Sequence, residues 1–339
     1  MPRWTPPLSI NQQIALAIIP KITSALSILG SVYITQHILR SPKRRSLCYH
    51  RILLGMSVMD IISSSRNFMS TWILPKETGA WGAVGTVGTC TAGGFFGQGS
   101  SISSALYNGS LALFYLLTVK YSWKDDAFGA YGGSKFSKIE PFMHAVPLGF
   151  GWATAIAGLP LLLYNPIGWT CWIAEVPRGC DRNPDVPCER GDNSYIYRWA
   201  FFHAELWATF IAVIVMMLVM YKSVRDKEKK TRRYSVRQSA TGGGGGSSGG
   251  GSSQASRVAM QALLYVLAYC ITWIFPMVTW LTQLTQGKTY TVILILQAFF
   301  VPLQVSIFIH MDACMHACMH VYSLCSSPLL IANIHSTSL

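Results

Sequence analysis

The sequence predicts an all-α membrane protein, a bundle of seven transmembrane helices with its N-terminus outside the cell. Two observations lead to this prediction. Of the 339 residues, 51% are hydrophobic and only 12% are charged, which is about half the charged fraction of an ordinary soluble domain. The net charge of +13 lies between long apolar runs rather than on one water-facing surface, which excludes a nucleic-acid-binding protein.

Seven segments are long enough to cross a hydrocarbon core about 30 Å thick, which takes roughly 20 mostly apolar residues. They cover residues 13–39, 52–74, 95–119, 142–164, 199–221, 258–282 and 291–310. Backbone polar groups must be satisfied inside the lipid, so each segment is expected to be helical. The first half of the third segment is rich in Gly and Ser. Small residues let helices pack closely, so we expect this helix at the centre of the bundle.

The loops between these segments set the orientation, because cytoplasmic loops are enriched in Lys and Arg. The loop after the first segment and residues 222–256 are both strongly basic, which places them in the cytoplasm. Residues 1–11 are then a short extracellular N-terminus, and residues 12–311 form the bundle. Within the third cytoplasmic loop, 222–256, residues 242–253 are all Gly or Ser, the composition of a flexible linker.

The last residues, 312–339, form an atypical tail. His, Asp and Cys alternate densely between positions 310 and 320, as they do in some metal sites. The repeated Ala-Cys-Met-His string at residues 313–320 is, however, what a repeated DNA tetranucleotide encodes, and we predict no metal site. We interpret the tail as the product of a frameshift or a retained intron that begins near Val305.

Four cysteines lie on the predicted exterior, where disulfides persist. Cys90 precedes the third segment, and Cys171, Cys180 and Cys188 follow the fourth. Four cysteines allow three pairings. We favour Cys90 with Cys171, which ties the third helix to the second external loop, and Cys180 with Cys188, which closes a small loop. Free thiols are the alternative.

Seven helices with a cysteine at the top of the third and another in the second external loop resemble G-protein-coupled receptors. Around the loop cysteine, the sequence from Trp169 to Ile173, Trp-Thr-Cys-Trp-Ile, resembles a signature shared by secretin-type receptors and the cyclic-AMP-receptor-like group of protists. The short N-terminus leaves no room for the hormone-binding domain of secretin-type receptors, so the second group fits better. The resemblance covers residues 12–304.

Two departures from the receptor pattern stand out. The Asp-Arg-Tyr motif that ends the third helix of rhodopsin-type receptors is absent from residues 119–123. In the sixth helix, residues 270–276 resemble a Cys-Trp-x-Pro switch only loosely. Pro276 is expected to kink this helix, because proline removes a backbone hydrogen bond. The resemblance implies a conformational switch at Trp273 and Pro276, and the alternative is a kink that only shapes the bundle.

Ionisable side chains within a span are costly to bury and are therefore candidate functional residues. Asp60 lies in the cytoplasmic half of the second helix, and the resemblance implies that it belongs to a polar network. In the outer halves of the helices we expect a polar cavity that binds a ligand. Its candidate residues are Lys21, Arg66, Asn67, Arg198, His203, Glu205, Trp273 and Trp280.

The candidate cavity contains cations that could select its ligand. A pair such as Arg66 and Lys21 would favour an anionic ligand, of which a cyclic nucleotide phosphate is one example. The alternative is that Lys21 and Arg198 extend to the lipid headgroups, while Arg66 is neutralised by Glu205 or Asp60.

The function that these features favour is a non-enzymatic receptor, embedded in the lipid bilayer of the plasma membrane, for an extracellular small-molecule or peptide ligand. The resemblance implies that it signals through a heterotrimeric G protein. The expected contacts with the G protein are Lys120, Tyr121, Lys222, Arg225, Arg232 and Arg233. No cofactor is expected, and the absence of lysine from Thr291 onward excludes a retinal Schiff base in the seventh helix. The alternatives are a transporter or channel with Asp60, Arg66 and Glu205 along its pathway, and a non-signalling receptor fragment.

Overall fold

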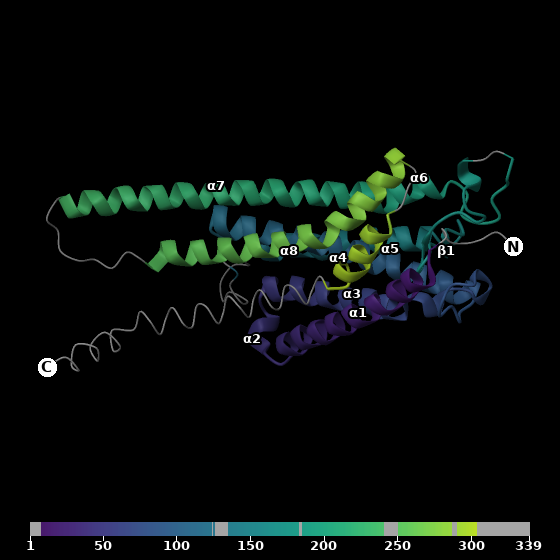
Figure 1. The fold of residues 1–339 in the computed structure, drawn as a ribbon. Helices are drawn as coiled ribbons and strands as arrows, with labels where there is room; N and C mark the ends of the chain where they lie inside the picture. Colours follow the sequence, from purple (N-terminus) through teal and green to yellow (C-terminus); the bar gives the residue numbers. More distant parts are fainter. Residues whose placement is uncertain are drawn as a thin grey trace, which may run out of the picture.

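The computed structural model describes residues 8–123, 125, 135–182, 185–240, 250–286 and 290–303. Long helices lie side by side along one axis and form an elongated bundle (Figure 1). In chain order the longer helices are α1 (Ile10–Leu39), α3 (Cys48–Met69), α4 (Val87–Tyr121), α5 (Lys135–Ala157), α7 (Ala204–Ala240), α8 (Gly250–Gln286) and α9 (Thr291–Phe300). The short helices are α2 (Pro42–Arg45), α6 (Ser194–Arg198), a π-helix (Trp199–His203) and 3-10 turns at Ser70–Ile73, Lys76–Thr78 and Cys180–Arg182.

Four stretches of the described helices are long and apolar enough to cross a membrane, which makes the chain a multi-pass membrane protein. They are Ile10–Leu39, Val87–Tyr121, Ser194–Lys227 and Val266–Thr285. The described part of α9 is apolar but shorter. Helix α3 carries Asp60, Arg66 and several serines, and α5 contains two prolines, so their composition is less apolar.

Helix α4 lies at the centre of the bundle, as its small residues predicted. It packs against α3, α5, α7 and α8 and also against the hairpin described below. The contact with α5 is close because a Cβ at Gly99 would lie 2.8 Å from the ring of Trp152, and one at Gly151 would lie 2.7 Å from the carbonyl oxygen of Gly99. The side-chain hydroxyl of Ser103 also donates to the carbonyl of Pro147, at 3.0 Å. Small side chains therefore set the spacing of these two helices.

Asp60 joins α3 to α1. Its Oδ2 accepts hydrogen bonds from the hydroxyls of Ser27 (2.9 Å), Ser31 (2.7 Å) and Ser64 (3.4 Å), and all four side chains are buried. A buried carboxyl group needs such partners, because burial removes the water that would otherwise solvate it. The predicted polar position thus holds two helices together.

The structure corrects three details of the predicted organisation. The chain is mostly rather than wholly helical, because β1 (Tyr164–Pro166) and β2 (Cys171–Ile173) form an antiparallel hairpin in which Asn165 is paired with Trp172. Helix α5 ends at Ala157 rather than at position 164, since Pro160 disfavours helical geometry in the residue before it. Residues 250–253, predicted to be linker, form the first turn of α8, whereas 241–249 lie outside the described residues.

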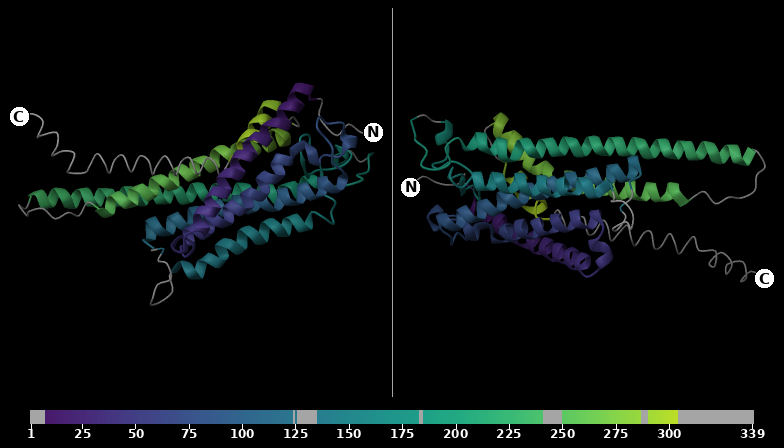
Figure 2. Two further views of the ribbon diagram at one scale, coloured as in Figure 1. Left: turned by 90° about the horizontal axis from the view of Figure 1, so that it is seen from below. Right: turned by 180° about the vertical axis from the view of Figure 1, so that it is seen from behind.

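The two ends of the bundle differ in chemistry. The hairpin and the start of α1 share one end, while α2 and the long C-terminal extension of α7 lie at the other (Figures 1 and 2). Helix α2 is Pro-Lys-Arg-Arg, and the extension of α7 is rich in Lys and Arg. Basic residues therefore collect at the end away from the hairpin.

Asp125 caps α3 at the basic end. The N-cap residue Leu47 offers no side-chain acceptor, and the two carboxylate oxygens of Asp125 accept from the backbone N–H groups of Cys48 (3.0 Å) and Tyr49 (3.1 Å). A carboxylate at a helix N-terminus satisfies otherwise unpaired donors and favours the helix dipole. The loop after α4 is thereby attached to α3.

We expect Asp125→Ala to lower the free energy of unfolding by about 1 kcal/mol, because the first turn of α3 loses its cap. Asp125→Asn keeps one acceptor and should lose less. Thermal unfolding in detergent micelles measures the difference, with Asp226→Ala on the exposed face of α7 as the matched control. An Asp125→Ala protein as stable as the control would contradict the capping role.

Candidate functional site

A cavity of about 170 Å³ lies at the hairpin end of the bundle. Its lining side chains come from α1, α3, α4, the π-helix, α8 and α9, and from the turn between β1 and β2. The hairpin thus forms one wall of this partly open space, and the helices form the others. Of the predicted ligand-binding residues, Arg66, Asn67, Arg198, His203, Trp273 and Trp280 line this cavity, and Pro276 lines it too.

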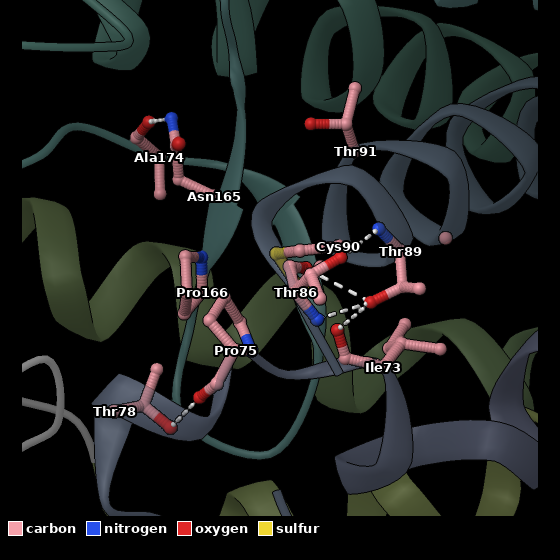
Figure 3. Close-up of a disulfide and its surroundings, with 12 residues drawn as sticks. Ile73, Pro75, Thr78, Thr86, Thr89, Cys90, Thr91, Asn165, Pro166 and Ala174 are labelled. Atoms are coloured by element: carbon pink, nitrogen blue, oxygen red, sulfur yellow. Dashed lines mark hydrogen bonds between the residues drawn. A yellow bond between two sulfur atoms is a disulfide. The ribbon is translucent and has the colours of Figure 1, made fainter. Parts of the chain in front are cut away.

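A disulfide fastens the hairpin to the start of α4. Cys90 in the first turn of α4 is bonded to Cys171 in β2, with their Cα atoms 5.3 Å apart (Figure 3). Thr86 and Thr89 cap this helix end reciprocally, and the hydroxyl of Thr89 also donates to the carbonyl of Ile73 at 3.0 Å. Cys90 therefore anchors the hairpin to a helix end whose position is itself fixed by hydrogen bonds.

The second disulfide closes the loop that follows the hairpin, joining Cys180 to Cys188. Both pairings are the ones that the sequence analysis favoured. Asn165 in β1 donates to the carbonyl of Ala174 at 2.7 Å (Figure 3) and accepts from the guanidinium of Arg190 at 2.8 Å. These contacts hold the loop against the hairpin.

Gln98 is a buried residue at this site that sequence reasoning missed. Its Oε1 accepts from the indole N–H of Trp172 at 2.8 Å, and its Nε2 donates to the carbonyl of Phe201 at 2.9 Å. One side chain on α4 thus links the hairpin to the π-helix. The sequence could have indicated Gln98, because its amide lies within a Gly- and Ser-rich span and a polar side chain in the membrane needs partners inside the protein.

The π-helix at Trp199–His203 directs aromatic rings into the cavity. Phe202 and His203 are buried and line it. The ring of Trp280 on α8 stacks on Trp199 at 4.8 Å and lies 5.0 Å from the ring of His203. Wide turns of this kind are frequent at functional sites, and here the turn brings aromatic residues before α7 into contact with α8.

Arg66 reaches across α4 to the hairpin. Its Nη2 donates to the carbonyl of Cys171 at 2.5 Å, its Nη1 to Oδ1 of Asn67 at 2.7 Å and its Nε to the carbonyl of Gly93 at 3.3 Å. A Cβ at Gly97 would lie 2.7 Å from the Nε atom, so only glycine leaves room for the guanidinium. Among the described residues no carboxylate lies within 4 Å of it, so the structure does not have the alternative arrangement in which Glu205 or Asp60 neutralises Arg66.

Three arginines, Arg66, Arg178 and Arg198, line the cavity, and none of the described lining residues is acidic. Glu175, outside the lining, lies 3.6 Å from the guanidinium of Arg198. It also accepts a hydrogen bond from the hydroxyl of Ser194 at 2.8 Å. Burial alone would raise the pKa of Glu175, but hydrogen bonds and the charges of Arg198 and Arg178 hold it below its ordinary value. The cavity wall as a whole is cationic.

Two predicted ligand-binding residues lie elsewhere. Lys21 donates to the hydroxyl of Ser70 at 2.6 Å and its ammonium lies 4.5 Å from the ring of Trp72. It lies five residues after the cavity-lining Leu16 on α1, which turns it about 140° away around the helix. Glu205 accepts from the hydroxyl of Thr209 at 2.8 Å and also does not line the cavity.

The residues predicted to form a conformational switch lie where the cavity meets the core. Trp273 is buried, 6.0 Å from the ring of Phe202 and 6.4 Å from that of Tyr269. Its indole nitrogen has no hydrogen-bond partner among the described residues. Pro276 follows one turn later inside α8 and lines the cavity. A change in the cavity would therefore act directly on α8.

Comparison with solved structures gives the same architecture. The crystal structure of squid rhodopsin is similar to this chain with a TM-score of 0.66, over 98% of this chain and 85% of that one, at 12% sequence identity. No family model matches the chain. No curated protein matches it either. The fold is therefore that of a rhodopsin-like helical bundle.

We expect Gln98→Ala to lower the free energy of unfolding by about 2 kcal/mol, because the half-buried indole N–H of Trp172 loses its acceptor and the carbonyl of Phe201 loses a donor. Chemical unfolding in detergent micelles measures the loss. Gln36→Ala on the exposed face of α1 is the matched control. Equal stabilities of the two variants would show that Gln98 does not hold the hairpin and the π-helix together.

Acid should destabilise the hairpin end through Glu175. A carboxyl group with a lowered pKa stabilises the fold above its unfolded-state pKa, and this contribution disappears as the pH falls through the folded-state pKa. The melting temperature should therefore fall more steeply below pH 4.5, the ordinary pKa of Glu175, in the unmodified protein than in Glu175→Gln. Glu189→Gln, which removes an exposed carboxyl from the same loop, should behave like the unmodified protein. If the melting temperature falls with decreasing pH to the same extent in all three proteins, the prediction is refuted.

Proposed function

We propose that this chain is a seven-transmembrane receptor of the cyclic-AMP-receptor-like group, which binds an extracellular ligand in the cavity below the hairpin and signals to a heterotrimeric G protein. The observation that carries the proposal is the position of the cavity. It lies within a rhodopsin-like bundle, under a disulfide-anchored hairpin, and touches the helices that could transmit a change to the other end.

Three further helices complete the seven spans that the proposal requires. Helices α3 and α5 pack against α4, and α9 packs against α1 and α8, so all three belong to the same bundle as the four strongly apolar stretches. Polar residues of α3 have partners inside the bundle, and Asp60 is an example. These hydrogen bonds lower the cost of placing this helix in the membrane. The described part of α9 ends before position 310, where the predicted seventh span ends, and the tail at 312–339 lies outside the described residues.

The distribution of charge supports an extracellular hairpin and a plasma-membrane location. Disulfides form and persist in oxidising surroundings, and both lie at the hairpin end. The basic helix α2 and the basic extension of α7 lie at the opposite end (Figure 1), as expected for cytoplasmic loops. The N-terminus of α1 is then outside the cell.

Signalling would use helix α8. A ligand that binds one arrangement of the helices more tightly shifts the population toward it. In this protein Trp273 and Pro276 contact the cavity, and the same helix packs against α7. At the basic end, the ammonium of Lys227 on α7 donates to the carbonyl of Val119 on α4 at 2.5 Å. A shift of α7 and α8 would disturb this contact.

The proposed surface for the G protein lies around the basic ends of α4 and α7. Lys120, Tyr121, Lys222 and Arg225 are exposed or half-exposed there, which leaves them accessible to a partner. Arg232 and Arg233 belong to α7, and their side chains lie outside the described residues. This surface is non-enzymatic in the proposal and acts only by binding.

The transporter alternative receives less support. A pathway would need its ionisable groups to face one continuous space, but Asp60 bonds to serines of α1 and α3, Arg66 lines the cavity and Glu205 bonds to Thr209. These three side chains have separate surroundings. The alternative of a non-signalling fragment is tested by the GTPγS assay below, which compares this chain with one whose end has been restored.

The receptor proposal predicts that membranes containing this chain accelerate the binding of radiolabelled GTPγS to a co-expressed heterotrimeric G protein. The Lys222→Glu, Arg225→Glu double variant should reduce this acceleration at least severalfold, because it reverses charge on the proposed contact surface. Lys76→Glu, an exposed lysine at the hairpin end, is the control. A second chain with its end restored from transcripts tests the tail. Exchange at the background rate with both chains, together with solute flux into vesicles, would overturn the proposal in favour of a transporter.

A further inference from the structure

Buried polar groups without partners line the cavity. The hydroxyl of Thr170, Nδ1 of His203 and Nε1 of Trp273 form no hydrogen bond within the described part of the chain, and these residues are 2%, 4% and 2% exposed. All three belong to the cavity wall. Buried polar groups in folded proteins are normally paired, so a bound molecule with hydrogen-bonding groups would complete this site.

The charge of the cavity selects an anion. Arg66 is held in place by two backbone carbonyls and the Asn67 amide oxygen. These three bonds occupy three of the five N–H groups of a guanidinium. Arg198 already has Glu175 as a partner, whereas Arg66 has no acidic partner among the described residues. A carboxylate has the opposite charge to Arg66 and can accept hydrogen bonds from its two remaining N–H groups.

The rest of the wall selects a flat ring. Trp172, Phe202, Trp273 and Trp280 line the cavity together with His203. Rings of this kind favour offset-stacked or edge-to-face contacts with another aromatic group. Because Trp280 is itself stacked on Trp199, its ring is fixed before a ligand arrives. The aromatic wall is therefore preorganised.

The volume limits the size of the ligand. The cavity of about 170 Å³ is only slightly larger than the cavity of about 150 Å³ that encloses a benzene molecule in an engineered protein. One ring with a carboxylate and a small substituent fits such a space. A base, a sugar and a phosphate together are larger than this space, so a cyclic nucleotide would extend beyond the cavity.

We infer that the cavity binds a small aromatic carboxylic acid, with its carboxylate on Arg66, its ring against Trp273 and Trp280, and a ring substituent in hydrogen-bond contact with His203. The inference rests on the proposed receptor function, since it names the ligand class of that cavity. It replaces the expected pair of Arg66 and Lys21 with Arg66 alone, because Lys21 lies outside the cavity.

The test measures direct binding to the purified full chain in lipid nanodiscs. The probes are 4-hydroxybenzoate and indole-3-carboxylate, each compared with its neutral primary amide and with cyclic AMP. Quenching of tryptophan fluorescence and a rise in melting temperature report binding without any G protein. We expect each acid to bind about tenfold more tightly than its amide, because the ion pair with Arg66 is lost in the amide.

Two variants assign the contacts. Arg66→Gln should bring the affinities of acid and amide together, whereas Lys76→Gln, an exposed cation outside the cavity, should leave their ratio unchanged. Trp280→Phe keeps a ring but shortens the stacking surface, and should weaken both acid and amide severalfold. If Arg66→Gln does not fold, the ratio of acid to amide in the unmodified protein and the Trp280→Phe result still decide the question.

Acids that bind no more tightly than their amides would overturn the inference, and so would cyclic AMP that binds more tightly than either acid. Binding of the acids without any effect on GTPγS exchange would contradict the receptor proposal and leave the assignment of the cavity standing. If a neutral or cationic molecule in this cavity drives GTPγS exchange, the receptor proposal stands and the assignment of an aromatic acid to the cavity is contradicted.

Discussion

The attachment of the β1–β2 hairpin to helix α4 is the constraint on which the rest of the site depends. A disulfide fixes Cys171 to the first turn of α4, and Gln98, about two turns further along, accepts from Trp172 and donates to the π-helix. Tyr164 of β1 lies directly over Gly94, where a Cβ would come within 2.7 Å of the ring. With the hairpin fixed in this way, its turn becomes a wall of the cavity. The same bonds set the position of the aromatic residues at the start of α7.

Charged residues within the bundle are stabilised in two different ways. Asp60 receives hydrogen bonds from three serines and thereby holds α1 against α3. Arg66 is bound by carbonyl and amide oxygens, which orient its guanidinium without neutralising it. The first arrangement is sufficient for structure alone. The second leaves a positive charge beside a cavity, which is why Arg66 rather than Asp60 carries the proposal about the ligand.

Helix α8 connects the two ends of the molecule. Its aromatic residues line the cavity, and Tyr269, one turn before Trp273, lies buried 6.2 Å from the ring of Phe210 on α7. At the basic end α7 meets α4 through Lys227 and Val119. Packed helices with discrete side-chain contacts change arrangement as units rather than bending continuously. A ligand that moves Trp273 would therefore change the packing of α8 against α7.

The sequence by itself determined the membrane character and predicted the central place of α4 and the cysteine pairing that the structure has. These features follow from the length and composition of single segments, from small residues and from the side on which cysteines lie. Only the tertiary structure decided which polar residues share a cavity. It excluded Lys21 and Glu205 and added Arg178 and Thr170, because the direction of a side chain depends on helix rotation, on a π-turn and on a hairpin that no local pattern specifies. It also revealed Gln98, which holds the hairpin from α4 without lining the cavity. The sequence suggested Arg66 as a cation of the site, but the residue that orients its charge, Cys171 through its carbonyl oxygen, became visible only once the hairpin was placed beside Arg66.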